Sequence, residues 1–493
     1  MKVLFVFPNE YLNIGIPQGI AILSACLKRA GHSTDIFDFT FVKQREVTFK
    51  ETSNFLPTEY TLEDLVKNDP IEDIDVAFNK KVQEFVPDLI AVSVMSSSFD
   101  MASSLLRKNQ ACISGIPVVF GGVHPTIDVE DVLSHDIVDY AIVGEGEEAL
   151  VELADKLQQG LSVYDIKNLA YKDTSGAMHI NELRPFVDLD SLPCPDWSIF
   201  DRRHLFRPFM GKVYNGSFYG MSRGCPYQCN YCVNSTLKKI QKDCGRYFRY
   251  QSVEKTFRDL QQLKEKFGVN WIKLLDDSIM SFPIQYIENL HDRLIKLDMK
   301  FGCSVRPETT TVDKVRLLKN MGCVAMSVGI ESGNEEIRKV QLGRRMSNEQ
   351  IKSAINIIND AGIRVSTFNM VGLPNETREN VFETINLNRE LNVSACNCYV
   401  IFPYPGTPIA ISSGKDYRDM NGEFIPVEKA SSFLLSKMSA DEVEGLHKTF
   451  NLYLHLPQNM WDIVQAAEGN SIRANNLFDA LNVLVDNYFL FQE

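Results

Sequence analysis

The chain has 493 residues, more than one hydrophobic core usually serves, so we expect two or three domains. Its formal net charge of -13 argues against a nucleic-acid-binding protein, because binding phosphates requires clustered Lys and Arg. The first residues, MKVLFVFPNEYLNIG, fit neither a signal peptide nor a membrane span, and eleven cysteines are too few for a disulfide scaffold. We therefore expect a cytoplasmic protein whose thiols are core residues or metal ligands.

Short apolar runs alternate with helical segments over residues 1–160. The runs are KVLFVF, STDIFDF, DLIAVSV, IPVVFGG and DYAIVG, and a helix is expected from about Gly19 to Ala30. Apolar strands separated by helices predict a parallel sheet with helices on both faces, which is a doubly wound, Rossmann-like α/β domain. Residues 40–85 are expected to form an irregular insertion followed by a helix. Residues 161–210 are the predicted linker, since DLDSLPCPDWSIFD within them has prolines and acidic turn residues without periodicity.

The alternation resumes over residues 211–410 with a second set of apolar runs, which are YGMSRG, NWIKLLDD, KFGCSV, AMSVGIES, RVSTFNMVG and ACNCYVIFP. These strands, interleaved with helices, predict a partial (β/α)6 barrel of the TIM type. In such barrels the chemistry lies at the carboxyl ends of the strands. Residues 411–493 are helical in pattern and rich in aromatic side chains, and we expect them to form a small helical domain that caps the barrel.

Three cysteines, Cys225, Cys229 and Cys232, follow the first barrel strand with the spacing Cys-x3-Cys-x2-Cys. Three thiolates on one tight loop can ligate three irons of a cubane cluster and leave the fourth iron open to an outside ligand. The alternatives are a zinc site or buried thiols, but structural zinc needs four ligands, and no fourth Cys or His has a suitable spacing nearby. Tyr231, between the last two cysteines, has a ring that could stack on an adenine.

This Cys-x3-Cys-x-Tyr-Cys motif on a partial barrel resembles the radical S-adenosylmethionine superfamily. The resemblance implies a 4Fe–4S cluster whose open iron chelates S-adenosylmethionine, together with an external electron donor such as flavodoxin or ferredoxin. Electron transfer from the cluster would then give methionine and a 5'-deoxyadenosyl radical that abstracts hydrogen, with the barrel supplying orientation. The expected metal ligands are Cys225, Cys229 and Cys232.

By the same resemblance, side chains at the ends of barrel strands would support S-adenosylmethionine. Asp276 and Asp277 end the second strand, where a carboxylate can accept a hydrogen bond from an ammonium group. Arg306 follows the third strand and is a candidate for a carboxylate contact. Glu331 ends the fourth strand, where it would hold ribose hydroxyls, and Glu376 in VGLPNET follows the fifth. The alternative for each carboxylate is a helix cap or a turn residue.

The first domain has small and glycine-rich segments at predicted strand ends, namely AVSVMSSSF, GGVHPT and VGEGEE. Such glycines let a large cofactor approach the backbone, and ligands of doubly wound sheets bind at the carboxyl ends of the strands. In this order, ahead of the barrel, the segments resemble the cobalamin-binding domain of cobalamin-dependent radical enzymes. The residues implied to contact cobalamin are Ser93, Ser96, Gly121, Gly122, His124, Pro125, Thr126, Gly144, Glu145 and Gly146.

The segment after the first strand departs from classical cobalamin domains. Those domains carry Asp-x-His-x-x-Gly there, and the histidine binds cobalt, whereas this chain has EYLNIG over residues 10–15. Gly15 fits the pattern, but Leu12 stands at the histidine position and has no lone pair to donate. We therefore expect either cobalt without a histidine lower ligand or a domain that has lost cobalamin. His124 is an alternative ligand, although a hydrogen-bonded loop histidine is the plainer interpretation.

Together the two domains imply a methylase acting on an unactivated carbon, or on phosphorus, of a small-molecule or lipid-like substrate, through methylcobalamin and a 5'-deoxyadenosyl radical. The alternative is a radical enzyme of the same architecture that performs ring contraction, cyclisation, carbon–carbon coupling or oxidation. Methylthiolation of RNA is disfavoured, because the first domain has only Cys26 and Cys112 and the chain has no basic module. Aromatic residues near the C-terminus, including Trp461, leave open a substrate channel or a membrane contact, with packed helical core as the plainer interpretation.

Overall fold

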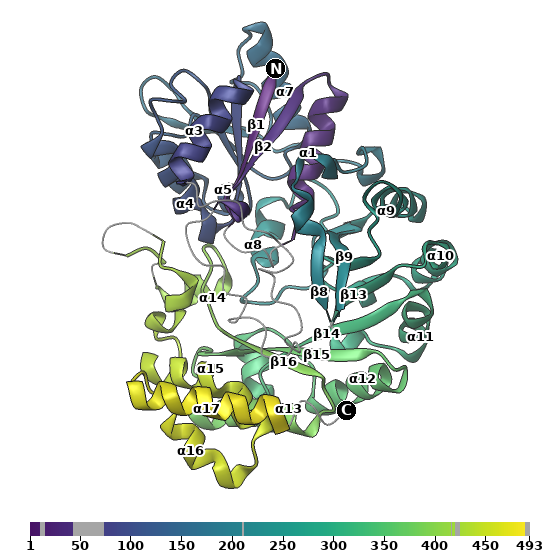
Figure 1. The fold of residues 1–493 in the computed structure, drawn as a ribbon. Helices are drawn as coiled ribbons and strands as arrows, with labels where there is room; N and C mark the ends of the chain where they lie inside the picture. The colour runs from purple at the N-terminus through teal and green to yellow at the C-terminus, as the bar shows by residue number, and fades with distance from the viewer. Residues whose placement is uncertain (10–14, 43–72, 210–211, 416, 420–423, 489–493) are drawn as a thin grey trace.

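The computed structural model describes residues 1–9, 15–42, 73–209, 212–415, 417–419 and 424–488. Leu12 and most of the predicted insertion therefore lie outside the described residues. Figure 1 shows two α/β lobes, one formed by the N-terminal sheet and one by the barrel strands, with the C-terminal helices packed beside the last barrel strands. Among the described residues, no helix is both long enough and apolar enough to cross a membrane.

The N-terminal lobe is the predicted doubly wound sheet, with strand order β2-β1-β3-β4-β5-β6-β7 among the described residues. Its parallel strands coincide with the predicted apolar runs and are β1 (Lys2–Phe7), β2 (Ser33–Asp38), β3 (Leu89–Val94), β4 (Val118–Gly122) and β5 (Tyr140–Ile142). Alternate residues of β1 enter different cores, Val3 and Phe5 on one face and Leu4 and Val6 on the other. Both faces are therefore buried, as a parallel sheet requires.

Helices cover both faces of this sheet. One face packs against α1 (Gln18–Arg29) and α7 (Glu147–Gln159). The other face packs against α3 (Ile74–Phe85), α4 (Ser96–Lys108) and α6 (Val129–Ser134), and the short helix α5 (Val123–Ile127) follows β4. The doubly wound class predicted from the sequence is thus confirmed for this lobe.

The region predicted as a linker, residues 161–210, is more ordered than expected. It adds the antiparallel strands β6 (Leu169–Lys172) and β7 (Met178–Ile180) to the first sheet, beyond the predicted end of that domain at residue 160. These strands are short and β7 is exposed, so they lack the apolar runs by which the other strands were found. The rest packs firmly, because Trp197 and Phe200 are buried in a core shared by both lobes.

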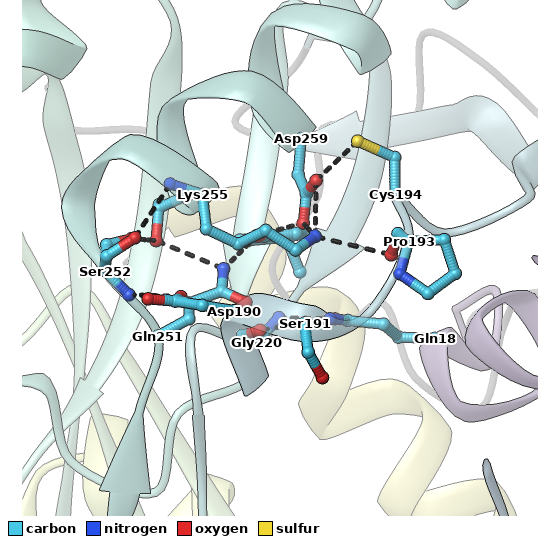
Figure 2. Close-up of polar contacts among 12 residues, drawn as sticks. Gln18, Asp190, Ser191, Pro193, Cys194, Gly220, Gln251, Ser252, Lys255 and Asp259 are labelled. Atoms are coloured by element: carbon cyan, nitrogen blue, oxygen red, sulfur yellow. Dashed lines mark hydrogen bonds and ion pairs between the residues drawn. The ribbon is translucent and has the colours of Figure 1, made fainter. Parts of the chain in front are cut away.

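Polar contacts also fasten this region to the barrel helix α9 (Val253–Phe267), as Figure 2 shows. The ammonium of Lys255 lies 3.3 Å from the carbonyl oxygen of Pro193 and 2.7 Å from Oδ1 of Asp259. The thiol of Cys194 donates to the same Asp259 oxygen at 2.7 Å, and the Ser252 backbone N–H donates to Asp190 at 2.7 Å. Residues 190–194 are therefore held against the barrel by these contacts.

The second lobe is the predicted partial barrel, with strand order β16-β15-β14-β13-β12-β9-β8 in the described chain. The parallel strands are β9 (Lys212–Tyr219), β12 (Trp271–Leu274), β13 (Lys300–Val305), β14 (Cys323–Glu331), β15 (Arg364–Val371) and β16 (Ala395–Val400). The antiparallel strand β8 (Phe206–Phe209) precedes them. The helices between the strands are α8 (Val233–Ile240), α9, α10 (Ile284–Leu294), α11 (Val312–Met321), α12 (Asn348–Asp360) and α13 (Arg378–Glu390).

The first barrel strand lies upstream of its predicted position. The sequence placed it at YGMSRG, but β9 ends at Tyr219, and β10 (Ser222–Arg223) instead pairs with β11 (Arg249–Tyr250) in a separate antiparallel ribbon. The true strand, KVYNGSFY, contains Asn215 and Gly216, which interrupt its apolar pattern and made it inconspicuous.

The C-terminal region is helical as predicted, with α14 (Pro408–Ser413), α15 (Ala440–His455), α16 (Trp461–Ala466) and α17 (Ile472–Tyr488). Side chains of α15 share a core with β16 and α13, so these helices cover the edge strand of the barrel sheet (Figure 1). The ring of Trp461 packs 5.0 Å from that of Phe382 and 5.4 Å from that of Tyr453. Trp461 is therefore a packing residue, as the plainer interpretation held.

Candidate cofactor site

The loop that carries the three cysteines begins with a turn that needs glycine. Residues 220–224 connect the end of β9 to Cys225. Gly224 has φ of 75°, and a Cβ atom there would lie 2.4 Å from the carbonyl oxygen of Tyr247. A side chain at this position would therefore push the loop out of its path.

The three thiols are held in a largely buried environment. Cys225 and Cys229 are buried and Cys232 is half-buried. Burial, with smaller contributions from Asp277 and the other two thiols, raises the pKa of Cys225 to about 12. A cationic group must therefore displace this proton to bind the sulfur. Within the described part of the chain, no group of three or more His, Cys, Asp or Glu side chains is arranged to hold a single metal ion, and ligation by these thiols stays a prediction.

Arg306, which follows β13, lies beside the cysteine loop. Its Nη1 atom donates to Sγ of Cys229 at 3.1 Å, and its guanidinium lies 3.8 Å from the centre of the Tyr227 ring. Its Nε atom donates to Glu308 at 2.8 Å. Arg306 thus pairs with a carboxylate of the chain and places a positive charge next to a predicted cluster ligand, while its predicted contact with the carboxylate of S-adenosylmethionine stays a prediction.

Asp276 and Asp277 have different environments although they are neighbours. Asp276 is 4% exposed and accepts hydrogen bonds from the backbone N–H of Met221 at 3.2 Å and from the hydroxyl of Ser222. Burial raises its pKa to about 6. Asp277 is exposed and accepts from the amide of Asn234 at 3.2 Å. Asp276 therefore supports the backbone ahead of Cys225, whereas Asp277 is the carboxylate accessible to a ligand.

Tyr231, Glu331 and Arg344 form a compact polar group next to the cysteine loop. The hydroxyl of Tyr231 donates to Oε1 of Glu331 at 3.0 Å, and Nη1 of Arg344 donates to the same oxygen at 2.7 Å. Nη2 of Arg344 donates to the carbonyl of Gly329 at 2.9 Å, and its side chain is 2% exposed. Glu331 has φ of 70°, which is unusual for a residue with a side chain. Arg344 was not predicted, because it follows no strand.

A cavity of about 410 Å³ lies between the two lobes at the carboxyl ends of the first sheet. Its walls are mostly apolar or glycine. Seven residues predicted to contact cobalamin line it, namely Ser93, Gly121, Gly122, Thr126, Gly144, Glu145 and Gly146. The hydroxyl of Thr126 donates to the carbonyl of Gly122 at 2.7 Å and accepts from the N–H of Gly144 at 3.0 Å, which joins two of these loops.

Other predicted residues lie away from this cavity. Ser96, His124 and Pro125 are buried but are not among the residues that line it. The ring of His124 is fully buried, with Nδ1 3.1 Å from Oγ of Ser96 and Nε2 3.0 Å from Asp131. Both ring nitrogens are therefore engaged, which leaves none for cobalt and agrees with the plainer interpretation of this histidine.

Gly15 has an unexpected neighbour. A Cβ atom at Gly15 would lie 1.9 Å from the ring of Phe218 in β9, so the glycine permits close contact between the lobes. The cobalamin contact predicted there stays a prediction, and Leu12 lies outside the described residues.

Lys273 lies on the inner face of the barrel sheet, beside small residues of the next three strands. The strand register places Lys273 on the same face as Gly302 and Ala325, with Ser327 and Ser366 one layer higher. The ammonium of Lys273 donates to Oγ of Ser327 at 3.3 Å, and Ser366 donates to the same oxygen at 3.0 Å. Burial lowers the pKa of Lys273. The barrel interior is therefore polar around Lys273.

Glu376, which follows β15, is a buried carboxyl. Its Oε2 atom accepts from the N–H groups of Gly372 at 2.8 Å and Leu373 at 3.1 Å. Its Oε1 atom is buried without a hydrogen-bond partner among the residues that the structure describes. Burial raises the pKa of Glu376 to about 8, so the carboxyl keeps its proton at neutral pH.

This pKa predicts a pH-dependent stability. From about pH 4.5 to about pH 8 this carboxyl holds a proton in the native state that it has released in the unfolded chain, so its contribution to the unfolding free energy falls by about 1.4 kcal/mol per pH unit. Glu376→Gln cannot titrate and should lose this component. In denaturant unfolding, the unfolding free energy of the variant should increase relative to that of the natural chain as pH rises. Glu379→Gln, at a nearby exposed carboxylate, should show no such trend, and a flat difference for Glu376→Gln would mean that the carboxyl is ionised.

Comparison with protein-family models finds two matches, the radical SAM superfamily over residues 219–387 and the B12 binding domain over residues 60–154. The first covers the barrel from the end of β9 to α13, including the cysteine loop, and the second covers much of the N-terminal lobe. The chain therefore contains a radical SAM domain with a B12 binding domain ahead of it.

Individual relatives agree with this assignment. The chain is 26% identical to an uncharacterized methyltransferase of Pyrococcus horikoshii over 83% of this chain and 82% of that protein. It is 24% identical to the anaerobic magnesium-protoporphyrin IX monomethyl ester cyclase of Cereibacter sphaeroides, over 83% of this chain and 63% of the cyclase. The fold matches that of the radical S-adenosylmethionine methyltransferase TsrM of Kitasatospora setae, solved with cobalamin and a [4Fe-4S] cluster, with a TM-score of 0.65 and 15% identity over 98% of this chain and 99% of TsrM.

Proposed function

We propose that this protein is a cobalamin-dependent radical S-adenosylmethionine methylase that acts on an unactivated carbon, or on phosphorus, of a small-molecule or lipid-like substrate. The observation that carries the proposal is the cavity, because it brings the glycine-rich loops of the B12 binding domain against the strand end that leads to Cys225. Similarity to proteins named as methyltransferases supports methyl transfer as the outcome.

The residues present fit the three cofactors. Three neighbouring soft thiol ligands suit iron in a 4Fe–4S cluster, and they would be Cys225, Cys229 and Cys232. A cavity lined by apolar side chains and glycines suits the flat base in the nucleotide tail of cobalamin. When bound, the cluster and S-adenosylmethionine supply a 5'-deoxyadenosyl radical, and cobalamin supplies a methyl carrier.

The chain's own residues would orient these groups. Asp277 is the exposed carboxylate beside the cysteine loop and would accept from the ammonium of S-adenosylmethionine. Glu331 and Tyr231, already fixed by Arg344, would contact its ribose and adenine. The polar barrel interior around Lys273 would receive the substrate. An external one-electron donor such as flavodoxin or ferredoxin, in a reducing compartment such as the cytoplasm, would complete the system.

The test is anaerobic reconstitution of the full chain with iron, sulfide, hydroxocobalamin, a reductant and S-adenosylmethionine labelled in its methyl group. We expect S-adenosylhomocysteine to form and the labelled methyl group to appear in the cobalamin fraction, because methylation of cobalamin consumes one S-adenosylmethionine. Liquid chromatography with mass spectrometry measures both products. Consumption of S-adenosylmethionine to 5'-deoxyadenosine without S-adenosylhomocysteine would contradict methyl transfer.

A second function is a non-methylating radical reaction, such as ring closure or oxidation, in the same architecture. The similarity to a magnesium-protoporphyrin IX monomethyl ester cyclase favours it. This alternative predicts 5'-deoxyadenosine as the product derived from S-adenosylmethionine, with no labelled methyl group in the cobalamin or in the substrate. The labelling experiment therefore separates the two functions.

A further inference from the structure

The four residues Gly220–Arg223, here called the lead-in segment, connect β9 to the turn before Cys225. All four line the cavity between the lobes. The same cavity wall therefore belongs both to the predicted cobalamin site and to the backbone that positions the first cluster ligand. How the lead-in segment is held determines whether the two sites act on each other.

The first end of the lead-in segment is held by a side chain of the N-terminal lobe. Gln18, the first residue of α1, accepts a hydrogen bond at Oε1 from the N–H of Gly220 at 2.6 Å. Its Nε2 atom donates to the carbonyl of the same glycine at 3.0 Å, as Figure 2 shows. One side chain thus satisfies both backbone polar groups of Gly220, which fixes the orientation of the two peptide groups on either side of its Cα atom.

The other end of the lead-in segment is held by Glu145. Oε1 of Glu145 lies 2.7 Å from Nη1 of Arg223 and also pairs with Arg249, while Oε2 accepts from the N–H of Val187 at 3.0 Å. Arg223 forms a second ion pair with Glu147. These ion pairs are largely shielded from solvent, because the side chains of Glu145 and Glu147 are 17% and 6% exposed.

A carboxylate is needed at this position for a physical reason. Arg223 and Arg249 lie directly opposite each other in the β10–β11 ribbon, where like charges repel. Glu145 pairs with both arginines, and Glu147 supplies a second negative charge through Arg223, so the ribbon from which the cysteine loop extends is held closed. Asp276 holds the middle of the lead-in segment through Met221 and Ser222. The N-terminal lobe therefore holds both ends of this segment, and the barrel holds its centre.

We propose that Gln18 and Glu145 are positioning residues that couple the cavity to the cluster, so that cobalamin in the cavity and the cluster on Cys225 stabilise each other. A ligand in the cavity would contact Gln18, Glu145 and the lead-in segment together and restrict their motion. Ordering the same segment is also part of the cost of holding the cluster. Whichever of the two cofactors binds first orders the segment, so the second binds without that cost. This is positive coupling without a change of fold.

The inference rests on the proposed cofactors, and its test measures the cofactors rather than turnover. The full chain, reconstituted with its cluster, is mixed with excess EDTA in the absence or presence of saturating hydroxocobalamin, and loss of cluster absorbance is followed. We expect cobalamin to slow iron loss by about fivefold or more in the natural chain. In Gln18→Leu and Glu145→Gln the ratio of the two rates should fall close to one.

Linkage supplies an independent second measurement. The affinity for hydroxocobalamin should be higher in cluster-loaded protein than in cluster-free protein, by a factor set by the same coupling. Glu152→Gln is the matched control, because Glu152 lies on α7 and pairs with Lys156 and Arg184, not with the lead-in segment. It should keep both factors at their natural values.

Specific outcomes separate the inference from the proposal beneath it. If the natural chain binds cobalamin but loses iron at the same rate with or without it, the coupling is refuted while the proposed cofactors stand. If Gln18→Leu and Glu145→Gln both keep the coupling factor of the natural chain, the role of these residues is refuted. Failure of the natural chain to bind cobalamin would overturn the inference and the proposed function together. The two variants alter opposite ends of the segment, so misfolding of one leaves the other as the test.

Discussion

Cys229→Ala is expected to prevent assembly of the cluster. Iron bound after anaerobic reconstitution should fall from about four atoms per chain to below about one, and 5'-deoxyadenosine formation should fall at least about a hundredfold. The reason is that, under the proposed function, three thiols supply the ligands of three irons and S-adenosylmethionine takes the fourth. Removing the sulfur also deprives Arg306 of a hydrogen-bond acceptor at 3.1 Å. Iron analysis, the absorption spectrum and chromatography of the nucleoside product measure the effect.

Cys244→Ala is the matched control for this experiment. Cys244 is also a buried free thiol, and it follows α8, shortly after the cysteine loop. The variant should retain iron and activity, since its change is confined to packing. Natural iron content in Cys229→Ala would contradict the assignment of Cys229 as a ligand. Equal loss of iron in both variants would attribute the loss to misfolding rather than to ligation.

The regular part of the fold could be predicted from the sequence because periodicity reports burial. The runs in β1, β3 and β4 are apolar on both faces of a parallel sheet, and they stood out as continuous hydrophobic segments. The hairpin β6–β7 did not, because it is antiparallel, short and partly exposed at the sheet edge. Such a strand forms because it pairs with a neighbouring strand, and this pairing is hardly visible in the local amino-acid composition.

The candidate site shows the same division between local and long-range information. The cysteine spacing and the glycine-rich loops are contiguous motifs, and the structure places the glycines of both GGVHPT and VGEGEE on the cavity wall. His124 is in the same motif, but its contacts with Ser96 and Asp131 depend on how α4, α5 and α6 pack. Arg344 and Gln18 are in no motif that the sequence analysis used. Only the fold brings them to their partners, Glu331 and Gly220.

Arg344→Met should strongly destabilise the barrel. The side chain of Arg344 is 2% exposed and that of Glu331 is 12% exposed, and their closest atoms are 2.7 Å apart. Removing the arginine leaves the carboxylate of Glu331 desolvated and without its cationic partner, which typically costs about 3–5 kcal/mol of unfolding free energy. Denaturant unfolding measures this loss. Arg316→Met removes an arginine whose pair with Asp313 is 68% and 72% exposed, so it should change stability by less than about 1 kcal/mol.

The double variant Glu331→Gln, Arg344→Met tests whether the unpaired charge is the cause. With Gln at position 331 there is no buried charge to leave unpaired, and Tyr231 still has an oxygen to donate to. The double variant should therefore be more stable than Arg344→Met alone, by about 1–3 kcal/mol. If the double variant is instead no more stable than Arg344→Met, the loss in Arg344→Met comes from packing. In that case packing holds Tyr231, Glu331 and Arg344 in place, and their charges are available to a bound ligand.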